Sequence, residues 1–344
     1  MKRSFGIAAL VAALLSACPA DAHEKWFYDS SALPLRWDLF FAPLPLTFFA
    51  LVIVATVLAG LLWRKRRYRD FIPGPEVFGA DDRRRRIVYA ILPLIIGVHF
   101  AVPLVVDGAH TVLFSPDDHI KGAWAYIFGV TETGIALAFF YGGFTRLAAA
   151  LLALLWFAGI FVAGLQPMLE NTVFLGAAAF FFMAGRGPLS IDRLMFPMLE
   201  PSDRLMRHAV LPLRIGLGIS LTVVAFTEKF ANLPLATHFL EKYPLNFTAA
   251  LGLPMSNELF MLCAASVELG VGLFLTFGIF PREIIILAWL PFNLTLSVFN
   301  STELIGHLPI YGIMALLLIW IPGDERNLDD WTDGLARELG PLRV

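Results

Sequence analysis

Charged residues are scarce in this sequence. They make up 16% of the 344 residues, whereas 58% are hydrophobic and the mean hydropathy is +0.72. Because soluble domains carry about 25% charged residues, this composition excludes an ordinary water-soluble globular protein. Apolar runs of about 20 residues, the length needed to cross a bilayer core, recur along the chain. The sequence therefore predicts an all-α integral membrane protein.

Cysteine is nearly absent as well. Cys18 lies near the N-terminus and Cys263 lies inside an apolar run. There is no CxxC, CxxCH or iron–sulfur spacing, which excludes a covalently attached haem and a cysteine-bound cluster. The Walker motif, the G-x-S-x-G elbow and the H-E-x-x-H zinc motif are also missing. Any redox role would therefore need a diffusible, non-covalent or metal cofactor.

The first residues are typical of a secretory leader, with a basic start, an apolar stretch at 5–15 and small residues after it. Two processing sites remain open. Cleavage after Ala22, at an A-x-A site, would leave His23 as the mature N-terminus. A lipobox would instead leave an acylated Cys18. We favour the first, because Pro19 follows that cysteine directly.

Nine membrane-spanning helices are expected after the leader, at 43–63, 87–106, 122–143, 147–164, 172–185, 212–230, 258–280, 283–299 and 305–321. Nine Lys and Arg residues lie in the loop 64–86. The positive-inside rule then places this loop and the C-terminus in the cytoplasm of a bacterial inner membrane. We interpret the basic runs as topology anchors with some lipid attraction, so the bilayer is the expected partner and nucleic acid is not.

One pattern occurs twice in the chain. Both copies read E-x-G-x-x-L-x-x-x-x-G-x-F-x-R, and they begin at Glu132 and Glu268. Upstream of them, and allowing for a short insertion in the second copy, His99 aligns with Lys229. The glycine two positions after each Glu is expected to let another helix approach closely. The chain is therefore predicted to contain two copies of one membrane module, which share one orientation because each has four spans.

The repeated pattern resembles the DoxX-like family of four-helix membrane proteins. The resemblance rests on an arginine that begins the first helix, a polar residue that ends it, and the E-x-G…G-x-F-x-R cassette, and it covers both copies of the four-helix unit. The family unit is usually single, whereas here it is doubled. The leader and the first span are additional. The resemblance implies a subunit or partner of quinone-linked or sulfur-linked oxidoreductases, although many such proteins have no assigned activity.

The expected organisation has eight parts. In order they are a signal peptide (1–22), a periplasmic segment (23–42), a first transmembrane helix (43–63), a basic cytoplasmic loop (64–86), a first DoxX-like unit (87–187), a cytoplasmic linker (188–211), a second DoxX-like unit (212–323) and a cytoplasmic tail (324–344). The fold class is thus two parallel four-helix units after one N-terminal span.

Glu132 and Glu268 are the first candidates for catalysis. An acid in hydrocarbon is costly unless it faces other protein groups, so it is a functional candidate by default. Each could carry a proton during quinone chemistry, could bind a metal or a substrate, or could only fix helix packing. His99 and Lys229 are their expected partners, with Glu228 as an alternative for the lysine. A His99–Glu132 pair could relay protons near neutral pH, which favours the first unit as the active one.

Further polar groups complete the candidate sites. Asn171, Asn293 and His307 lie in or beside spans and are candidates for cofactor binding. Arg146 and Arg282 follow the glutamates by 14 positions, about 21 Å along a helix. They are expected to cap helix C-termini and to bind lipid phosphate.

Histidines on the periplasmic side offer an alternative function. The amine and imidazole of a terminal His23 would chelate one ion, and His110 or His119 could complete a nitrogen site of the kind that suits Cu(II). No H-x-H spacing supports this site. We interpret 26–28, Trp-Phe-Tyr, as an interfacial aromatic anchor.

Three functions therefore remain open from the sequence. The leading one is a quinone-linked redox subunit that works with a periplasmic redox partner. The second is copper binding or transport at the periplasmic face. The third is an assembly subunit without chemistry of its own.

Overall fold

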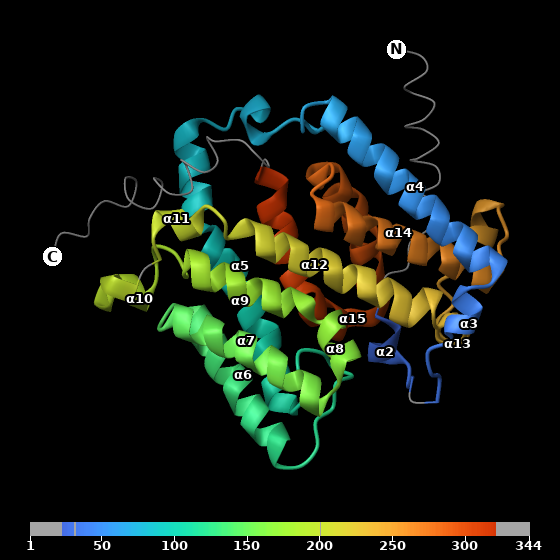
Figure 1. The fold of residues 1–344 in the computed structure, drawn as a ribbon, viewed down its shortest axis with the longest axis horizontal. Helices are drawn as coiled ribbons and strands as arrows, with labels where there is room; N and C mark the ends of the chain where they lie inside the picture. The colour runs from blue at the N-terminus through green and yellow to red at the C-terminus, as the bar shows by residue number, and fades with distance from the viewer. Residues whose placement is uncertain (1–22, 31, 200, 321–344) are drawn as a thin grey trace.

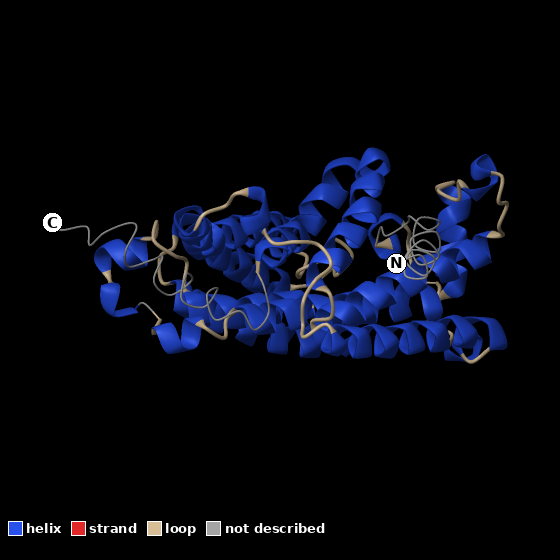
Figure 2. Cartoon of the chain, turned by 90° about the horizontal axis from the view of Figure 1, so that it is seen from above, coloured by secondary structure: helices blue, strands red, loops and turns tan. Residues whose placement is uncertain are grey.

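The computed structural model describes residues 23–30, 32–199 and 201–320. Within these ranges the chain forms helices and no strand (Figure 2). Seven helical spans are long and apolar enough to cross a membrane: Pro43–Lys65, Arg83–His110, Ala123–Tyr141, Thr145–Val162, Arg204–Phe230, Asn257–Phe277 and Ser301–Ile319. The chain is therefore an all-α, multi-pass membrane protein, as predicted. The leader with its two processing sites and the tail 324–344 lie outside the described residues.

The described helices follow the predicted spans closely. They are α2 (Glu24–Phe27), α3 (Trp37–Phe40), α4 (Pro43–Lys65), η1 (Pro75–Phe78), α5 (Asp82–His110), α6 (Ala123–Tyr141), α7 (Thr145–Val162), α8 (Leu165–Glu170), α9 (Thr172–Ala184), α10 (Ile191–Met195), η2 (Pro197–Leu199), α11 (Asp203–Met206), α12 (Val210–Val224), η3 (Ala225–Phe230), α13 (Leu233–Lys242), η4 (Thr248–Leu251), α14 (Asn257–Phe277) and α15 (Pro281–Ile319). Two predicted spans are not among the seven. The span 172–185 corresponds to the shorter α9, and 283–299 is the first part of α15.

The 39-residue helix α15 turns back on itself. Tyr311 Oη donates to the carbonyl of Phe292 at 3.0 Å, and Arg282 Nε donates to the carbonyl of Leu318, 36 positions further on, at 2.9 Å. A straight helix would separate the latter pair by about 54 Å. The two halves of α15 therefore lie antiparallel, as two consecutive spans would.

The helices of both repeats share one bundle. α7 packs on α9, α9 on α12, and α12 on α14, while α15 packs on α5 (Figure 1). The contact between α9 and α12 is close because Gly176 faces Gly216. A Cβ added to Gly216 would lie 2.9 Å from Gly176 Cα. Small residues that let backbones approach are the usual means of helix association in membranes.

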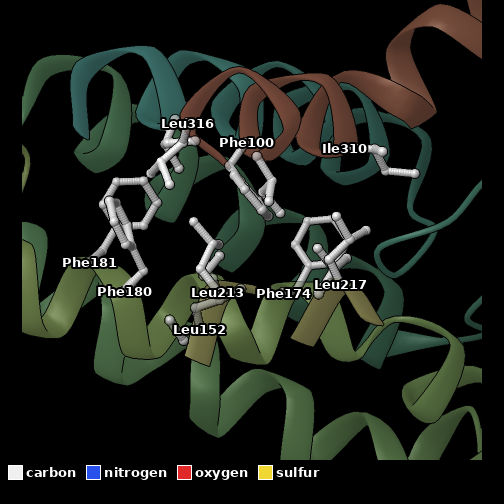
Figure 3. Packing of buried hydrophobic residues seen from close by; sticks show 14 of the residues in the cluster. Phe100, Leu152, Phe174, Phe180, Phe181, Leu213, Leu217, Ile310 and Leu316 are labelled. Carbon is white, nitrogen blue, oxygen red and sulfur yellow. The ribbon is translucent and has the colours of Figure 1, made fainter. Parts of the chain in front are cut away.

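The core joins the two repeats. Aromatic and aliphatic side chains from helices of both repeats meet in its centre (Figure 3). They include Phe100 of α5, Leu152 of α7, Phe174, Phe180 and Phe181 of α9, Leu213 and Leu217 of α12, and Ile310 and Leu316 of α15. Because both repeats contribute, neither buries its apolar face alone.

The Gly-x-Phe turn has the same backbone conformation in both copies of the repeat. Gly142 and Gly278 end α6 and α14 with φ of 69° and 67°. Phe144 and Phe280 then precede α7 and α15, also with positive φ, of 53° and 45°. Glycine adopts such left-handed conformations without strain. The glycines of the cassette thus serve a tight turn between two spans.

The arginines of the cassette also act alike. Arg146 Nε donates to the carbonyl of Phe182 at 3.1 Å, and Arg282 Nε donates to that of Leu318 at 2.9 Å. The two acceptors occupy equivalent positions of the two repeats, and each lies in the last turn of its helix. The predicted capping of helix C-termini is confirmed at both positions. We call this end of the bundle the basic end.

The predicted role of Gly134 and Gly270 is wrong. Among the described residues, a Cβ added at either position would meet nothing within 4 Å, so no described helix lies against them. The close approach occurs elsewhere in α6, where a Cβ on Gly129 would collide with the carbonyl oxygen of Gly108 in α5. The tight α5–α6 contact therefore lies one turn before Glu132.

Candidate functional site

Five ionisable residues form a buried cluster at the end of the bundle opposite the basic end. Lys229 is fully buried, and its Nζ donates to Glu268 Oε2 at 2.9 Å and to Glu24 Oε2 at 3.1 Å. The backbone N–H of Glu24 donates to Glu228 Oε2 at 2.5 Å. His23 Nδ1 lies 3.4 Å from Glu228 Oε1. We call these five residues the charge network.

A π-helical turn positions the centre of the network. α12 continues without a break into η3, whose six residues have π geometry. Such turns are frequent at functional sites, because the extra residue changes where side chains point. Glu228 faces His23 and the backbone of Glu24, whereas Lys229 reaches the carboxyls of Glu24 and Glu268. Two adjacent residues thus contact different parts of the network.

The segment 23–27, which contains α2, lies inside the protein. Glu24 is 1% exposed. Lys25 Nζ pairs with Glu170 Oε1 at 2.5 Å, and Trp26 Nε1 donates to Ser115 Oγ at 2.8 Å. Figure 1 shows α2 between α8 and α13. Trp26, expected to be part of a membrane anchor, instead packs its ring against His23 and His307.

His307 and Glu303 of α15 border the same region. The ring centroids of His23 and His307 are 5.5 Å apart, and those of Trp26 and His307 are 5.3 Å apart. His307 is 1% exposed, its Nδ1 lies 3.3 Å from Glu303 Oε1, and its Nε2 has no hydrogen-bond partner among the described residues. A buried imidazole nitrogen without a partner points to a water or an ion at this place.

A cavity of about 40 Å³ adjoins the network. Its lining includes His23, Trp26, Asn171 and Glu228. One water needs roughly 10–15 Å³ by this measure of volume, so the cavity accommodates a few waters or a small ion but no quinone ring. Asn171 Nδ2, in this lining, donates to Asp118 Oδ2 at 3.1 Å.

Burial and charge shift the pKa values of the two leading residues of this segment. Burial raises the pKa of the Glu24 carboxyl well above its usual value, although Lys229 opposes the shift. Burial alone would lower the pKa of His23. The hydrogen bond and charge of Glu228 outweigh that effect, and the pKa of His23 lies above its usual 6.5. Both groups therefore bind a proton more tightly when the segment is docked.

We expect the docking of 23–27 to weaken as the pH rises. A histidine whose pKa is raised by docking stabilises the docked state fully at pH values below 6.5. This stabilisation is lost as the pH rises through the pKa that the histidine has in the docked state. A carboxyl whose pKa is raised by docking destabilises the docked state as the pH rises above 4.5. Glu24 and His23 therefore both weaken docking at higher pH. Amide-exchange protection of 24–28, corrected for intrinsic rates, should fall as the pH rises above 6.5.

The double substitution His23→Gln, Glu24→Gln is the matched variant for this experiment. It removes both titrations while keeping hydrogen-bonding side chains, so protection should depend much less on pH. Protection of the native segment that stayed constant over the whole range would contradict the prediction.

Glu132 of the first repeat has different surroundings from Glu268. It is fully buried in α6, its Oε1 accepts the backbone N–H of Phe114 at 3.0 Å, and its Oε2 has no hydrogen-bond partner in the described part of the chain. Residue 114 belongs to the loop between α5 and α6. This carboxyl therefore fastens a loop, whereas Glu268 binds a buried lysine.

Only one of the two predicted pairs is formed. Lys229 contacts Glu268 as expected. His99 does not contact Glu132; its Nδ1 bonds to the carbonyl of Ile95 in its own helix at 2.7 Å, and its side chain packs beside Gly312. The sequence favoured the first unit as the active one because of an expected His99–Glu132 pair, and this pair is not formed. Which unit is active stays a prediction.

Several other predicted site residues lie apart from the network. Asn293 Nδ2 bonds within its own helix, to the carbonyl of Trp289 at 2.7 Å. His110 and His119 are exposed, and His110 Nδ1 bonds to the carbonyl of Val106 in α5. Across the described ranges, no three His, Cys, Asp or Glu residues are placed to hold a metal ion. The structure therefore does not assemble His23 with both loop histidines.

Sequence reasoning missed Glu24 and Lys25. Their burial follows from contacts with residues 205 and 145 positions away, which no local pattern reveals. One signal was available. Adjacent Glu228 and Lys229 within an apolar helix need partners, and Glu268 alone cannot serve both. A search for charged residues near the spans that had no proposed role would have pointed to the segment after the leader.

The fold and the site together define a multi-pass helical membrane protein with a buried charge network at one end of its bundle. Comparison with known proteins gives no match: no family model, no curated protein and no solved structure is significantly similar to this chain.

Proposed function

We propose that the protein is a proton-carrying membrane subunit of a quinone-linked redox system. The observation that supports this is the charge network, in which His23, Glu228, Glu24, Lys229 and Glu268 follow one another in unbroken contact. Ionisable residues inside a membrane protein are costly and commonly mark proton pathways. The redox part of the proposal rests on the DoxX-like resemblance of the repeat.

The proposed role is to supply or remove protons. A quinone that accepts two electrons from a redox partner protein also takes up two protons, and quinol oxidation releases them. The 40 Å³ cavity beside His23 admits water but no quinone ring. We therefore place the quinone in the surrounding membrane, and the proton path between the cavity and Glu268. By the positive-inside rule the basic end faces the cytoplasm, so the cavity lies on the periplasmic side.

The test compares two identical substitutions on one helix. Glu268→Gln keeps the shape of the side chain but removes the titrating group, whereas Glu258→Gln changes an exposed residue of the same α14. In vesicles that contain the protein, a quinone and an electron donor, Glu268→Gln should slow quinone-dependent electron flow by about 100-fold, in the range of lost acid–base catalysis. Glu258→Gln should leave the flow unchanged.

The alternatives give different results. If Glu268→Gln only lowered the unfolding temperature and left electron flow intact, the glutamate would serve architecture and the protein would be an assembly subunit. If the purified protein neither retained quinone nor changed the rate of electron flow, the redox proposal would be wrong.

Copper binding at the same end is a second candidate, favoured by one observation. The rings of His23 and His307 lie 5.5 Å apart, and His23 lines a cavity large enough for an ion. His307 Nε2 has no hydrogen-bond partner in the described structure. Cleavage after Ala22 would add the amine of His23 as a third nitrogen. Three nitrogen donors of this kind suit Cu(II).

Intact mass and copper content of the purified mature chain test this candidate. A chain that begins at His23 should bind one copper, and His307→Ala should abolish binding. His110→Ala, which changes an exposed histidine, should not. An acylated Cys18 at the N-terminus would exclude the site, because the amine would then belong to another residue.

A further inference from the structure

A second cavity, of about 1250 Å³, lies at the basic end of the bundle. It is bounded by the last turns of α4, by the loop at 66–76 and by the turn between α14 and α15. Typical small-molecule sites measure roughly 300–1,000 Å³, so the space is ample for a large ligand. No part of the charge network lines it.

The lining of this cavity is divided into an apolar part and a cationic part. Val57, Leu61 and Phe277 provide apolar surface. Five arginines, Arg64, Arg67, Arg69, Arg214 and Arg282, provide positive charge. Asp70 and Glu76 are the acidic residues in the lining, so the arginines outnumber the carboxyls. An amphiphile with an anionic head would match both parts.

Arg282, in the cationic part of the lining, is buried and held in place by hydrogen bonds, unlike the exposed arginines of the rim. It is 4% exposed, its Nε bonds to the carbonyl of Leu318, and its Nη1 lies 3.4 Å from the carbonyl of Ile72. Its Nη2 has no hydrogen-bond partner in the described ranges. A guanidinium donor that is buried and unpaired is suited to a phosphate oxygen.

The acid closest to this arginine opposes an anion only weakly. Asp70 Oδ2 lies 3.8 Å from Arg282 Nε. Burial, together with the nearby charge of Glu283, raises the pKa of Asp70 to about 7. Near neutral pH a large fraction of this carboxyl is therefore protonated, and the cationic part keeps its excess of positive charge.

The position of the cavity identifies the kind of ligand. Arg64 lies in the last turn of the membrane-spanning α4, so this rim is at the boundary between hydrocarbon and water. Phosphate head groups of the bilayer lie at this depth. α4 packs against α14, and its apolar face continues from the cavity along the span.

We propose that this cavity binds an anionic phospholipid, with its phosphate against Arg282 and the exposed arginines and its acyl chains against α4 and α14. Basic pockets between membrane helices are known to select such head groups. The lipid would fill the space between α4 and the rest of the bundle.

The test uses the full chain purified in detergent and analysed by native mass spectrometry after addition of phosphatidylglycerol or phosphatidylcholine. We expect the anionic lipid to be retained and the zwitterionic one to be lost. The triple substitution Arg64→Gln, Arg67→Gln, Arg69→Gln should weaken retention by about 100-fold. These three residues are exposed, so the variant should still fold.

The matched control removes the same charge elsewhere. Arg83→Gln, Arg84→Gln, Arg204→Gln changes three exposed arginines that do not line the cavity, and it should retain the lipid as the native chain does. Equal retention of both lipids, or equal loss in both triple variants, would overturn the proposal. Displacement of the lipid by millimolar inorganic phosphate would also overturn it, and would instead indicate a soluble phosphorylated ligand.

Discussion

Replacing Lys229 by methionine is expected to be among the most damaging single substitutions in the protein. The ammonium is fully buried and donates to both Glu24 and Glu268. Without it, two buried carboxyl groups lose their common partner. Breaking a buried ion pair in this way costs about 3–5 kcal/mol. Thermal unfolding of the purified protein in detergent should show a large fall in stability, or no folded protein at all.

Two further variants make this result specific. Lys121→Met removes an exposed lysine and should leave the unfolding temperature nearly unchanged. The triple variant Lys229→Met, Glu24→Gln, Glu268→Gln should regain much of the lost stability, because it removes the uncompensated charge along with the lysine. A Lys229→Met protein as stable as the native chain would show that the three groups do not form an ion-paired cluster.

Most of the transmembrane architecture could be predicted, because the signals for it are local. A span is recognised by its own apolar length, and a turn by its glycine. The span predicted at 43–63 is observed at Pro43–Lys65, and that predicted at 122–143 at Ala123–Tyr141. The hairpin in α15 also agrees with the two spans expected there, although hydrogen bonding runs through it as one helix.

The site was predictable only where the repeat supplied the information. Alignment of the two copies placed Lys229 near Glu268, and the structure brings them to 2.9 Å. The same argument failed for His99, because its ring finds an acceptor in its own helix at Ile95. The two positions also differ in backbone conformation, because His99 lies in the α-helix α5 and Lys229 in the π-helical turn η3. The repeat therefore predicted positions better than contacts.

The N-terminal segment shows a different limit. Its sequence, His-Glu-Lys-Trp at 23–26, reads as an exposed polar stretch beside an aromatic anchor. Its real environment is set by Glu170, Ser115 and Glu228, which come from three distant parts of the chain. Hydropathy describes a segment alone, and it cannot report that a charged segment fills a gap between helices. For this reason Glu24, a member of the charge network, went unrecognised.

The helix contact of α6 was predicted at the wrong glycine for a related reason. The sequence of a span does not show which of its glycines face a neighbouring helix. Gly129 and Gly134 lie on the same helix, α6, and the sequence indicated the second as the contact. In the structure, an added Cβ at Gly129 would collide with the backbone oxygen of Gly108, whereas one at Gly134 would meet no atom of the described chain within 4 Å. Alanine at the two positions should therefore change stability in opposite directions.

Gly129→Ala is expected to destabilise the protein by about 1–3 kcal/mol or more, because a backbone atom cannot move aside and α5 must separate from α6. Gly134→Ala should instead stabilise α6 by up to about 1 kcal/mol through helix propensity. Unfolding temperatures of the two purified variants, measured side by side, provide the comparison. Gly129 lies one turn before Glu132, so separating the helices should also loosen the loop that this carboxyl holds at Phe114. If Gly129→Ala proved as stable as Gly134→Ala, the close α5–α6 contact would not exist in the folded protein.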